Sequence, residues 1–391
     1  MTSSPDRGTA RRPAAGPRAR EVDGDPSAEG ASRGGIPAWL VGVAGLSIGV
    51  AIALRVLISH GMDPTIFVAL GEESTVETEY AIRLLGEVTT REGLGHDGRF
   101  FFAQANDPWY IEPELHATVL DDPRYRAQRM LFPLVAGGFG VFPPGVVAWS
   151  MLVTNVLALG LGAFLAALLA QRWGGAAWLG LGVPVNIGLL FELDIGGAGI
   201  VAYVCCLGAV YALATERIGL ASLLLAAAAL SREVMLLFAI GLFVLWWLEE
   251  RRFVWRIVTV PLLATAAWYA YVWYQLMGIS GVGGKGPNFA PPFVGVVEAF
   301  RSWLGDPIDL LVNLVLLSIV LAFVPLALRS RLPLAWGALP FIALAIVLSV
   351  EVLRDPFNLS RALAPVFTAI PFLIFGPTRV AIHADRSGRV P

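Results

Sequence analysis

An acidic residue with basic neighbours stands in a long polar stretch between two apolar runs. Asp97 lies between His96 and Gly98, and Arg99 follows. A carboxylate in this setting can accept a proton as a general base or bind a divalent metal ion such as Mg²⁺ or Mn²⁺. The basic side chains of His96 and Arg99 can hold an anionic substrate. Asp-Gly is also a common turn sequence, so a structural role for Asp97 stays open.

Arginines and carboxylates gather in three further places, each next to an apolar run. The first group, later in the same polar stretch, is Arg124, Arg126, Gln128 and Arg129. The second, in the middle of the chain, is Glu192, Asp194, Arg232 and Glu233, and the third, before the last apolar run, is Arg354, Asp355, Asn358 and Arg361. Among them, Arg126, Arg129, Arg232 and Arg361 are candidate substrate-binding residues. Glu233 is a second catalytic candidate, because a carboxylate between two apolar half-helices requires a partner. Its neighbour Arg232 would point to a different helix face.

The composition is typical of a membrane protein. Of the 391 residues, 56% are hydrophobic and 15% are charged, and the mean hydropathy is +0.69. Soluble domains contain about 25% charged residues. A formal net charge of −2 and the lack of a basic cluster interleaved with aromatics predict no nucleic-acid partner.

Long apolar runs predict an all-α, polytopic transmembrane helical bundle. The first run, 37–58, is long enough to cross the hydrocarbon core, which takes roughly 20 helical residues. The later runs lie near 146–170, 175–192, 197–214, 217–231, 234–249, 254–275, 308–328, 334–352 and 362–377. Together they predict about ten spans. Ser231-Arg232-Glu233 interrupts 217–249, so we expect two helices that meet there at a wet surface or a cavity.

The expected domains follow from these runs. Residues 1–36 lack apolar periodicity and predict a disordered tail with no cleaved signal peptide. After the first transmembrane helix, 37–58, residues 59–145 predict an external loop that caps the membrane domain. Within this loop, 131–142 is too short to span and predicts an interfacial or re-entrant helix. Residues 146–377 would form the transmembrane domain, and 378–391 a second tail.

The distribution of arginines predicts the orientation in the membrane. Short connections rich in arginine face the cytoplasm in multi-pass proteins. Here they contain Arg172, Arg217, Arg251, Arg252, Arg256, Arg329 and Arg331. We therefore expect both termini in the cytoplasm, a plasma (inner) membrane location, and an active site on the extracytoplasmic face. The phenylalanines at 100–102 could stack on a sugar or a polyisoprenoid, but an aromatic run near a membrane favours an anchor at the membrane interface.

Three motifs, taken in order, resemble a known family. They are Asp97-Gly98 followed by aromatics, Tyr125-Arg126-Ala127-Gln128-Arg129-Met130-Leu131-Phe132-Pro133-Leu134, and Ala229-Leu230-Ser231-Arg232-Glu233-Val234-Met235-Leu236-Leu237. Together they resemble polytopic glycosyltransferases of the GT-C fold, in particular bacterial relatives of the mannosyltransferases that build glycolipid anchors.

The resemblance implies a function at the cell envelope. It implies transfer of a sugar, with mannose as the first guess, from a polyprenyl-phosphate donor to a glycan, lipid or protein acceptor. Asp97 would be the base or a metal ligand, and Arg232 and Glu233 would lie near the sugar or the lipid phosphate. Because no second acid flanks Asp97, a metal-free reaction that relies on arginine, or on His96 as a helper, stays open.

Two other functions remain as alternatives. A transporter or flippase of lipid-linked sugars would also carry charges in its membrane segments. The lack of an internal repeat, and the expectation that the polar clusters share one face, favour the enzyme. A non-catalytic partner in cell-surface glycopolymer synthesis could use the same fold, because fold does not determine function.

Overall fold

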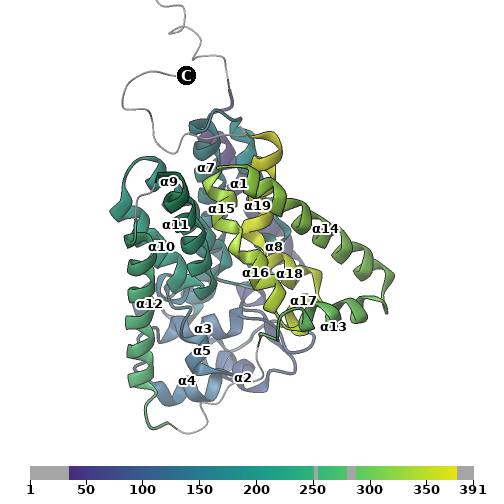
Figure 1. Cartoon of the computed structure of the whole chain (residues 1–391). Helices are drawn as coiled ribbons and strands as arrows, with labels where there is room; N and C mark the ends of the chain where they lie inside the picture. The colour runs from purple at the N-terminus through teal and green to yellow at the C-terminus, as the bar shows by residue number, and fades with distance from the viewer. Residues whose placement is uncertain (1–34, 251–253, 280–287, 377–391) are drawn as a thin grey trace, which may run out of the picture. The chain divides into compact units, whose positions relative to one another are not determined.

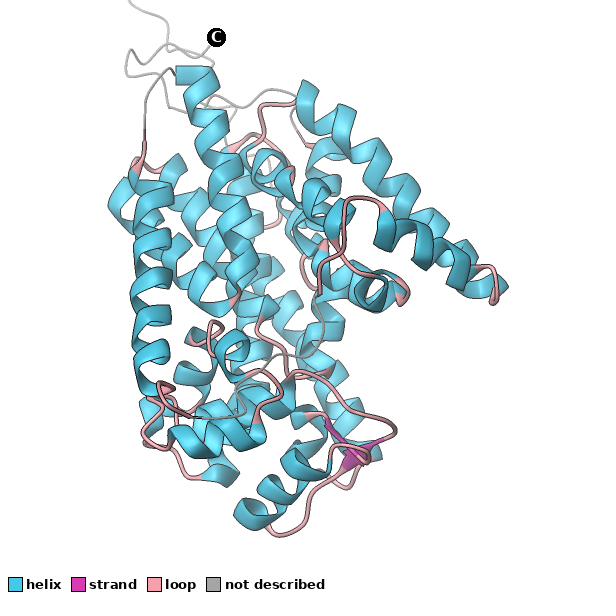
Figure 2. Cartoon of the chain, turned by 60° about the horizontal axis from the view of Figure 1, so that its bottom comes forward, coloured by secondary structure: helices cyan, strands magenta, loops and turns pink. Residues whose placement is uncertain are grey.

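The computed structural model is mainly helical over its described residues, which are 35–250, 254–279 and 288–376 (Figure 1, Figure 2). The predicted all-α class is confirmed. The exception is one short parallel pair, in which β1 (Leu70–Gly71) lies beside β2 (Thr90–Arg91). Apart from residues 35 and 36, the predicted tails at 1–36 and 378–391 lie outside the described residues.

Four helices among the described residues are long and apolar enough to cross a membrane. They are α1 (Ala38–Ser59), α7 (Pro144–Arg172), α12 (Arg256–Gln275) and α14 (Pro307–Arg329). The pair α18 (Pro356–Ala362) and α19 (Ala364–Phe375) would add a fifth span if the two helices, bent by 71°, count as one. These helices indicate a membrane protein, while the total of about ten spans stays a prediction.

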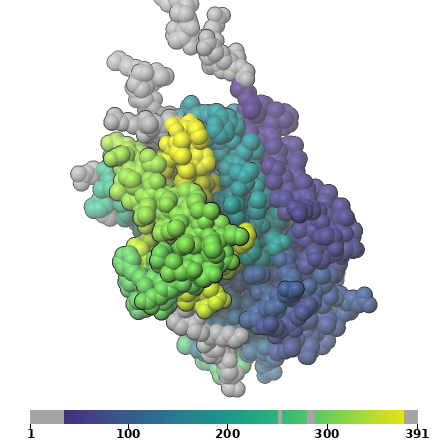
Figure 3. Space-filling view, turned by 90° about the vertical axis from the view of Figure 1, so that its right-hand side faces the viewer, coloured from purple at the N-terminus to yellow at the C-terminus, as the bar shows by residue number. Residues whose placement is uncertain are grey.

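The exposed surface of α14 supports this conclusion. Leu311 and Leu321 are 65% and 64% exposed, and much of the helix is apolar on every side. Exposed apolar surface of this extent requires an apolar surrounding such as lipid. Figure 3 shows α14 and α13 (Val294–Trp303) in green on one side of the surface, beside the first-loop residues in blue.

The remaining apolar runs form shorter helices. These are η4 (Ala177–Gly182), α8 (Ile187–Asp194), α9 (Gly199–Ala214), α10 (Ile218–Ser231), η5 (Glu233–Met235), α11 (Leu236–Glu250), α15 (Pro333–Ala338), α16 (Pro340–Val347) and α17 (Val350–Leu353). The expected span at 175–192 is therefore divided between η4 and α8. The predicted interruption at Arg232 is confirmed, because this residue is extended (φ −155°, ψ 112°) between α10 and η5.

The first loop is a compact set of short helices. They are η2 (Pro64–Val68), α2 (Thr75–Leu85), α3 (Gly98–Asn106), α4 (Pro113–Val119), α5 (Pro123–Arg126), α6 (Leu131–Ala136) and η3 (Gly138–Gly140). The helix predicted at 131–142 is divided into α6 and η3, and its interfacial or re-entrant placement stays a prediction. The expectation that 100–102 is an interfacial anchor is wrong, because the three phenylalanines are 1–2% exposed. They form part of a core in which the Phe101 and Phe132 rings meet edge to face at 5.6 Å.

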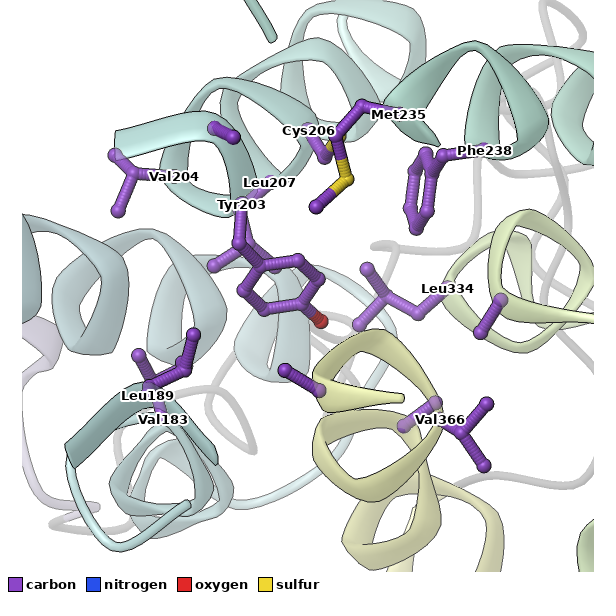
Figure 4. Close-up of a cluster of buried hydrophobic side chains, with 14 of the residues drawn as sticks. Val183, Leu189, Tyr203, Val204, Cys206, Leu207, Met235, Phe238, Leu334 and Val366 are labelled. Carbon is purple, nitrogen blue, oxygen red and sulfur yellow. The ribbon is translucent and has the colours of Figure 1, made fainter. Parts of the chain in front are cut away.

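A second hydrophobic core joins helices that are distant in sequence. Figure 4 shows Tyr203 of α9, Phe238 of α11, Leu334 of α15 and Val366 of α19 converging, with Leu189 of α8 nearby. All five side chains are almost completely buried. Close packing of this kind resists movement of the helices that it joins. It therefore helps to position α8, α10 and α18, which carry or precede Glu192, Arg232 and Arg361.

Candidate functional site

Asp97 is placed by the glycine that follows it. Gly98 begins α3, and a Cβ atom there would lie 2.4 Å from the carbonyl oxygen of Ile195 and 2.7 Å from that of Val68. Because only glycine leaves room for this approach, the start of α3 contacts the link between α8 and α9. The Asp97 side chain does not cap its own helix. Its carboxylate is directed instead toward arginines from other elements.

Three guanidinium groups surround the Asp97 carboxylate. Arg126 Nη1 donates to Oδ1 at 2.8 Å. Arg361 Nη1 and Arg129 Nη1 lie 3.2 and 3.4 Å from Oδ2. The three arginines come from α5, from α18 and from the link before α6. The structure thus brings together Asp97 and three of the predicted substrate-binding residues.

Arg126 and Arg129 each form a bidentate pair with a further carboxylate. Arg126 donates to both oxygens of Asp121, at 2.8 and 2.9 Å, and lies 4.1 Å above the Phe100 ring. Arg129 donates to both oxygens of Glu233, each at 3.0 Å, and to the Tyr125 hydroxyl. Such bidentate pairs determine orientation as well as charge. The partner predicted for Glu233 is therefore Arg129.

Glu192 holds the other two arginines of the cluster. Its Oε1 accepts from Arg232 Nη1 at 2.7 Å and lies 3.4 Å from Arg361 Nε, while Oε2 accepts the Gly199 N–H at 2.9 Å. The side chain is only 3% exposed. A Cβ at Gly197 would lie 1.8 Å from Oε2, so the backbone after α8 closes tightly around this carboxylate.

Charges alternate throughout this arginine–carboxylate cluster, which we define as Asp97, Asp121, Glu192, Glu233, Arg126, Arg129, Arg232 and Arg361. Its formal charges cancel. Burial alone would raise the pKa of Asp97, but the charges of Arg361, Arg126 and Arg129 outweigh burial and hold the pKa of this carboxyl well below its usual range. Burial lowers the pKa of Arg126, but the charges of Asp97 and Asp121 raise it by more, so the pKa lies above its usual value. Both groups are therefore fully charged at neutral pH.

A cavity of about 130 Å³ opens beside the cluster. Its lining includes charged groups, among them Asp97, Arg129 and Arg361. It also includes the aliphatic side chains of Leu344, Leu348 and Val352, which come from α16 and α17 and the link between them. Asn288 and Asn358 also line the cavity and supply amide groups that can bond to hydroxyls. The cavity therefore suits a ligand with a charged or polar head and an apolar body.

Two predicted residues lie beside the cluster and do not line the cavity. Arg99 contacts Ser74 and lies 3.3 Å from Glu77, and it makes no ion pair with Asp97. The His96 ring meets the Phe191 ring edge to face at 5.3 Å. Burial, followed by the nearby Arg361 charge, lowers the pKa of His96, so this imidazole is neutral at pH 7.

Glu192 and Asp121 are the residues that sequence reasoning missed as members of the site. Glu192 stands in the apolar run Leu190-Phe191-Glu192-Leu193, where an isolated carboxylate requires a partner. That signal placed it in a polar group without assigning it a role. Asp121 stands in a polar loop, and nothing in its neighbourhood distinguishes it from the adjacent Asp122.

The residues around Asp97 do not fit a Mg²⁺ or Mn²⁺ site. These ions prefer several oxygen ligands, and Mg²⁺ sites use carboxylates together with water or phosphate. Asp97 instead meets three guanidinium groups, which would repel a divalent cation. Over residues 35–250, 254–279 and 288–376, no three His, Cys, Asp or Glu side chains are grouped to share a metal ion.

No protein-family model, curated protein or solved structure matches this chain. The function is therefore inferred from the arginine–carboxylate cluster and the cavity beside it. Together they bring a carboxylate, several arginines and aliphatic side chains to the lining of one cavity.

Proposed function

We propose that the protein is a membrane glycosyltransferase that moves a sugar from a polyprenyl-phosphate donor to a glycan, lipid or protein acceptor, with mannose as the first candidate sugar. The observation that carries this proposal is the mixed lining of the cavity, which includes Asp97 and arginines together with Leu344 and Leu348. A polyprenyl phosphate has the matching character, since its charged head is joined directly to an apolar chain. The amides of Asn288 and Asn358 are suited to sugar hydroxyls.

The reaction requires one base and a group that stabilises the departing phosphate. The acceptor hydroxyl oxygen forms a bond to the anomeric carbon, and its proton passes to the Asp97 carboxylate. The bond from that carbon to the phosphate oxygen breaks, and its electron pair leaves with the phosphate. Arginines stabilise this charge. A single displacement inverts the anomeric centre.

Glu233 takes a different role from the one its sequence suggested. Both of its oxygens are engaged by Arg129, so it holds that arginine in place. We therefore assign Glu233 as a positioning residue and Asp97 as the catalytic base. Because the donor set around Asp97 does not suit a divalent ion, the arginines supply the positive charge in this proposal.

The orientation that this proposal requires agrees with the two ends of α7. Its C-terminal end lies near the start of α1, because Gln171 Nε2 donates to the Ile36 carbonyl at 3.0 Å. Its N-terminal end, Pro144, follows the first loop directly. The arginine-bearing end at Arg172 is thus opposite the end that joins the loop of Asp97. We propose that the first loop faces the extracytoplasmic side and that both termini face the cytoplasm.

The test is sugar transfer by the purified full chain in liposomes. Radiolabelled polyprenyl-phosphate mannose serves as donor and a membrane extract as acceptor, with wild type compared to Asp97→Asn. Asp107→Asn is the matched control, because Asp107 has the same chemistry at the other end of α3. Label should enter a glycan with wild type and the control but not with Asp97→Asn. Equal transfer by all three would reject Asp97 as the base. Movement of the donor between leaflets without transfer would replace the enzyme by a flippase.

A further inference from the structure

We infer that Asp97 occupies the place that the donor phosphate takes, and that the phosphate displaces Asp97 from Arg361 on binding. Asp97 is then both the base of the proposed reaction and an internal competitor of the donor. This inference rests on the proposed function, since it concerns how that same cavity receives its phosphate.

Among the three arginines that pair with Asp97, Arg361 is the one whose contacts are easiest to exchange. Arg126 and Arg129 are each held by two short bonds to a second carboxylate. Arg361 instead has one contact of 3.2 Å to Asp97 and one of 3.4 Å to Glu192. It lines the cavity, and its side chain is 15% exposed. A ligand phosphate can therefore reach Arg361 without breaking a bidentate pair.

The charge balance of the cluster explains why an exchange is needed. Asp121, Asp97, Glu192 and Glu233 already offset the four arginines, so the cluster holds no surplus positive charge. An added phosphate competes with an existing carboxylate for the same cations. Asp97 is the carboxylate that the phosphate would displace, because it forms ion pairs with three arginines that line the cavity.

The exchange would couple donor binding to catalysis. While Arg361 faces Asp97, the carboxylate is strongly stabilised as an anion and is a weak proton acceptor. When Arg361 turns to the phosphate, Asp97 loses one cation and gains a nearby negative charge. Both changes increase its affinity for a proton. The base would therefore become effective only when the donor occupies the cavity.

Equilibrium binding of a fluorescent polyprenyl phosphate to the full chain in detergent tests this inference without requiring transfer. The variant Asp97→Asn should bind about tenfold more tightly than wild type, which corresponds to roughly 1.4 kcal/mol. Asp194→Asn is the matched control, since it removes a nearby negative charge that pairs with Arg91 and does not line the cavity. Its affinity should stay within about threefold of wild type. Unchanged or weaker binding by Asp97→Asn would overturn the inference, as would equal tightening by Asp194→Asn.

A double-mutant cycle identifies the arginine that is exchanged. Adding Arg361→Gln to Asp97→Asn should remove most of the tenfold gain, because the released cation is then missing. If the gain persists, Arg361 is not the exchanged residue and the inference fails. If Asp97→Asn unfolds alone, recovery of folded protein with polyprenyl phosphate present would support it, and no recovery would overturn it.

Two further arms identify the ligand and separate this inference from the proposed function. Competition by inorganic phosphate shows whether the head group alone displaces Asp97. If it does not compete, the isoprenoid chain is needed to bring the phosphate to Arg361. We expect this outcome, because aliphatic side chains line the cavity. If wild type transfers sugar but Asp97→Asn binds polyprenyl phosphate no more tightly than wild type, only this inference is rejected. If wild type neither binds polyprenyl phosphate nor transfers sugar, the inference and the proposed function are both rejected.

Discussion

Asp97 and Asp107 stand at the two ends of the same short helix, α3, and their carboxylates have opposite kinds of partner. Asp107 accepts the backbone N–H groups of Ile111 and Glu112, at 3.0 and 2.8 Å, and contacts His116 Nε2 at 3.1 Å. All of these lie within nine residues of it. Asp97 has three arginines as partners, and Arg361 is far along the chain.

The difference separates a structural carboxylate from one available for chemistry. The bonds of Asp107 form a local turn, and the ring of its partner His116 stacks on Tyr110 at 3.9 Å. Asp107 also lines a cavity, of about 360 Å³, but its hydrogen-bond partners all lie within nine residues of it. The partners of Asp97 come from three separate elements and line a cavity. Neutral local donors would satisfy a carboxylate at lower cost, so the assembly of distant charges around Asp97 supports the binding function that we propose.

The largest effect is expected from exchanging the carboxylates one at a time. Asp97→Asn should lower the transfer rate by about 10²–10⁴-fold, the usual contribution of a general base. Asp107→Asn should leave transfer nearly unchanged and lower the free energy of unfolding by about 1–3 kcal/mol, because it weakens the bonds to two backbone N–H groups and to the buried His116. Radiolabel transfer and the thermal midpoint of the purified proteins measure the two effects. If Asp107→Asn also abolishes transfer while remaining folded, the two ends of α3 are not functionally distinct.

A smaller effect is expected when the arginines are displaced without changing any charge. Gly197→Ala would place a Cβ 1.8 Å from Glu192 Oε2 and so shift the carboxylate that holds Arg232 and Arg361. Misplacement by about 1 Å can reduce a rate by about 100-fold, so we expect a loss of roughly 10- to 100-fold in transfer. Gly145→Ala is the control, since a Cβ there meets nothing within 4 Å. Equal activity of the two variants would show that Glu192 does not position the arginines.

The sequence predicts the general features of this molecule better than its pairings. The all-α class and the break at Arg232 follow from hydropathy and from the cost of burying charge, which are local properties. The need of Glu233 for a distant partner follows from the same cost. The identity of that partner, Arg129, depends on how the first loop packs against η5, and no local rule contains this information.

The burial of 100–102 shows the same limit. A run of three phenylalanines near apolar segments predicts an interfacial anchor, yet the first loop has a core of its own that takes up all three rings. Tertiary packing thus overrides a local preference. The closeness of Arg99 to Asp97 in the sequence predicts a substrate-binding role. The helix that begins at Gly98 instead directs the Arg99 side chain toward Glu77. Sequence neighbours on a helix face different directions.

Low pH should destabilise the folded protein by protonating Asp97 and Asp107. The arginines outweigh burial and lower the pKa of Asp97 strongly, while His116 and backbone N–H groups outweigh burial and lower that of Asp107. A lowered folded pKa gives stability that is complete above the unfolded value of about 3.9 and is lost as pH falls toward the folded pKa. The thermal midpoint of wild type should therefore fall more steeply than that of Asp97→Asn below about pH 4. Parallel curves would show that Asp97 is not stabilised as an anion.

The smallest effect on transfer is expected at Arg99, which defines the boundary between the two regions of the loop. Arg99 lies 4.5 Å from the Phe100 ring, Arg126 lies 4.1 Å from the same ring, and Arg99 has no ion pair with Asp97. Arg99→Gln should therefore change transfer by less than about threefold, or roughly 0.6 kcal/mol. It should also lower the thermal midpoint, because Glu77, 12% exposed, loses its cation. Arg361→Gln is the comparison, with a larger loss of transfer. If Arg99→Gln instead lowered transfer as much as Arg361→Gln at an unchanged midpoint, the charge of Arg99 would act on the site through Phe100 and Arg126. The site would then extend beyond the cavity into the core of the first loop.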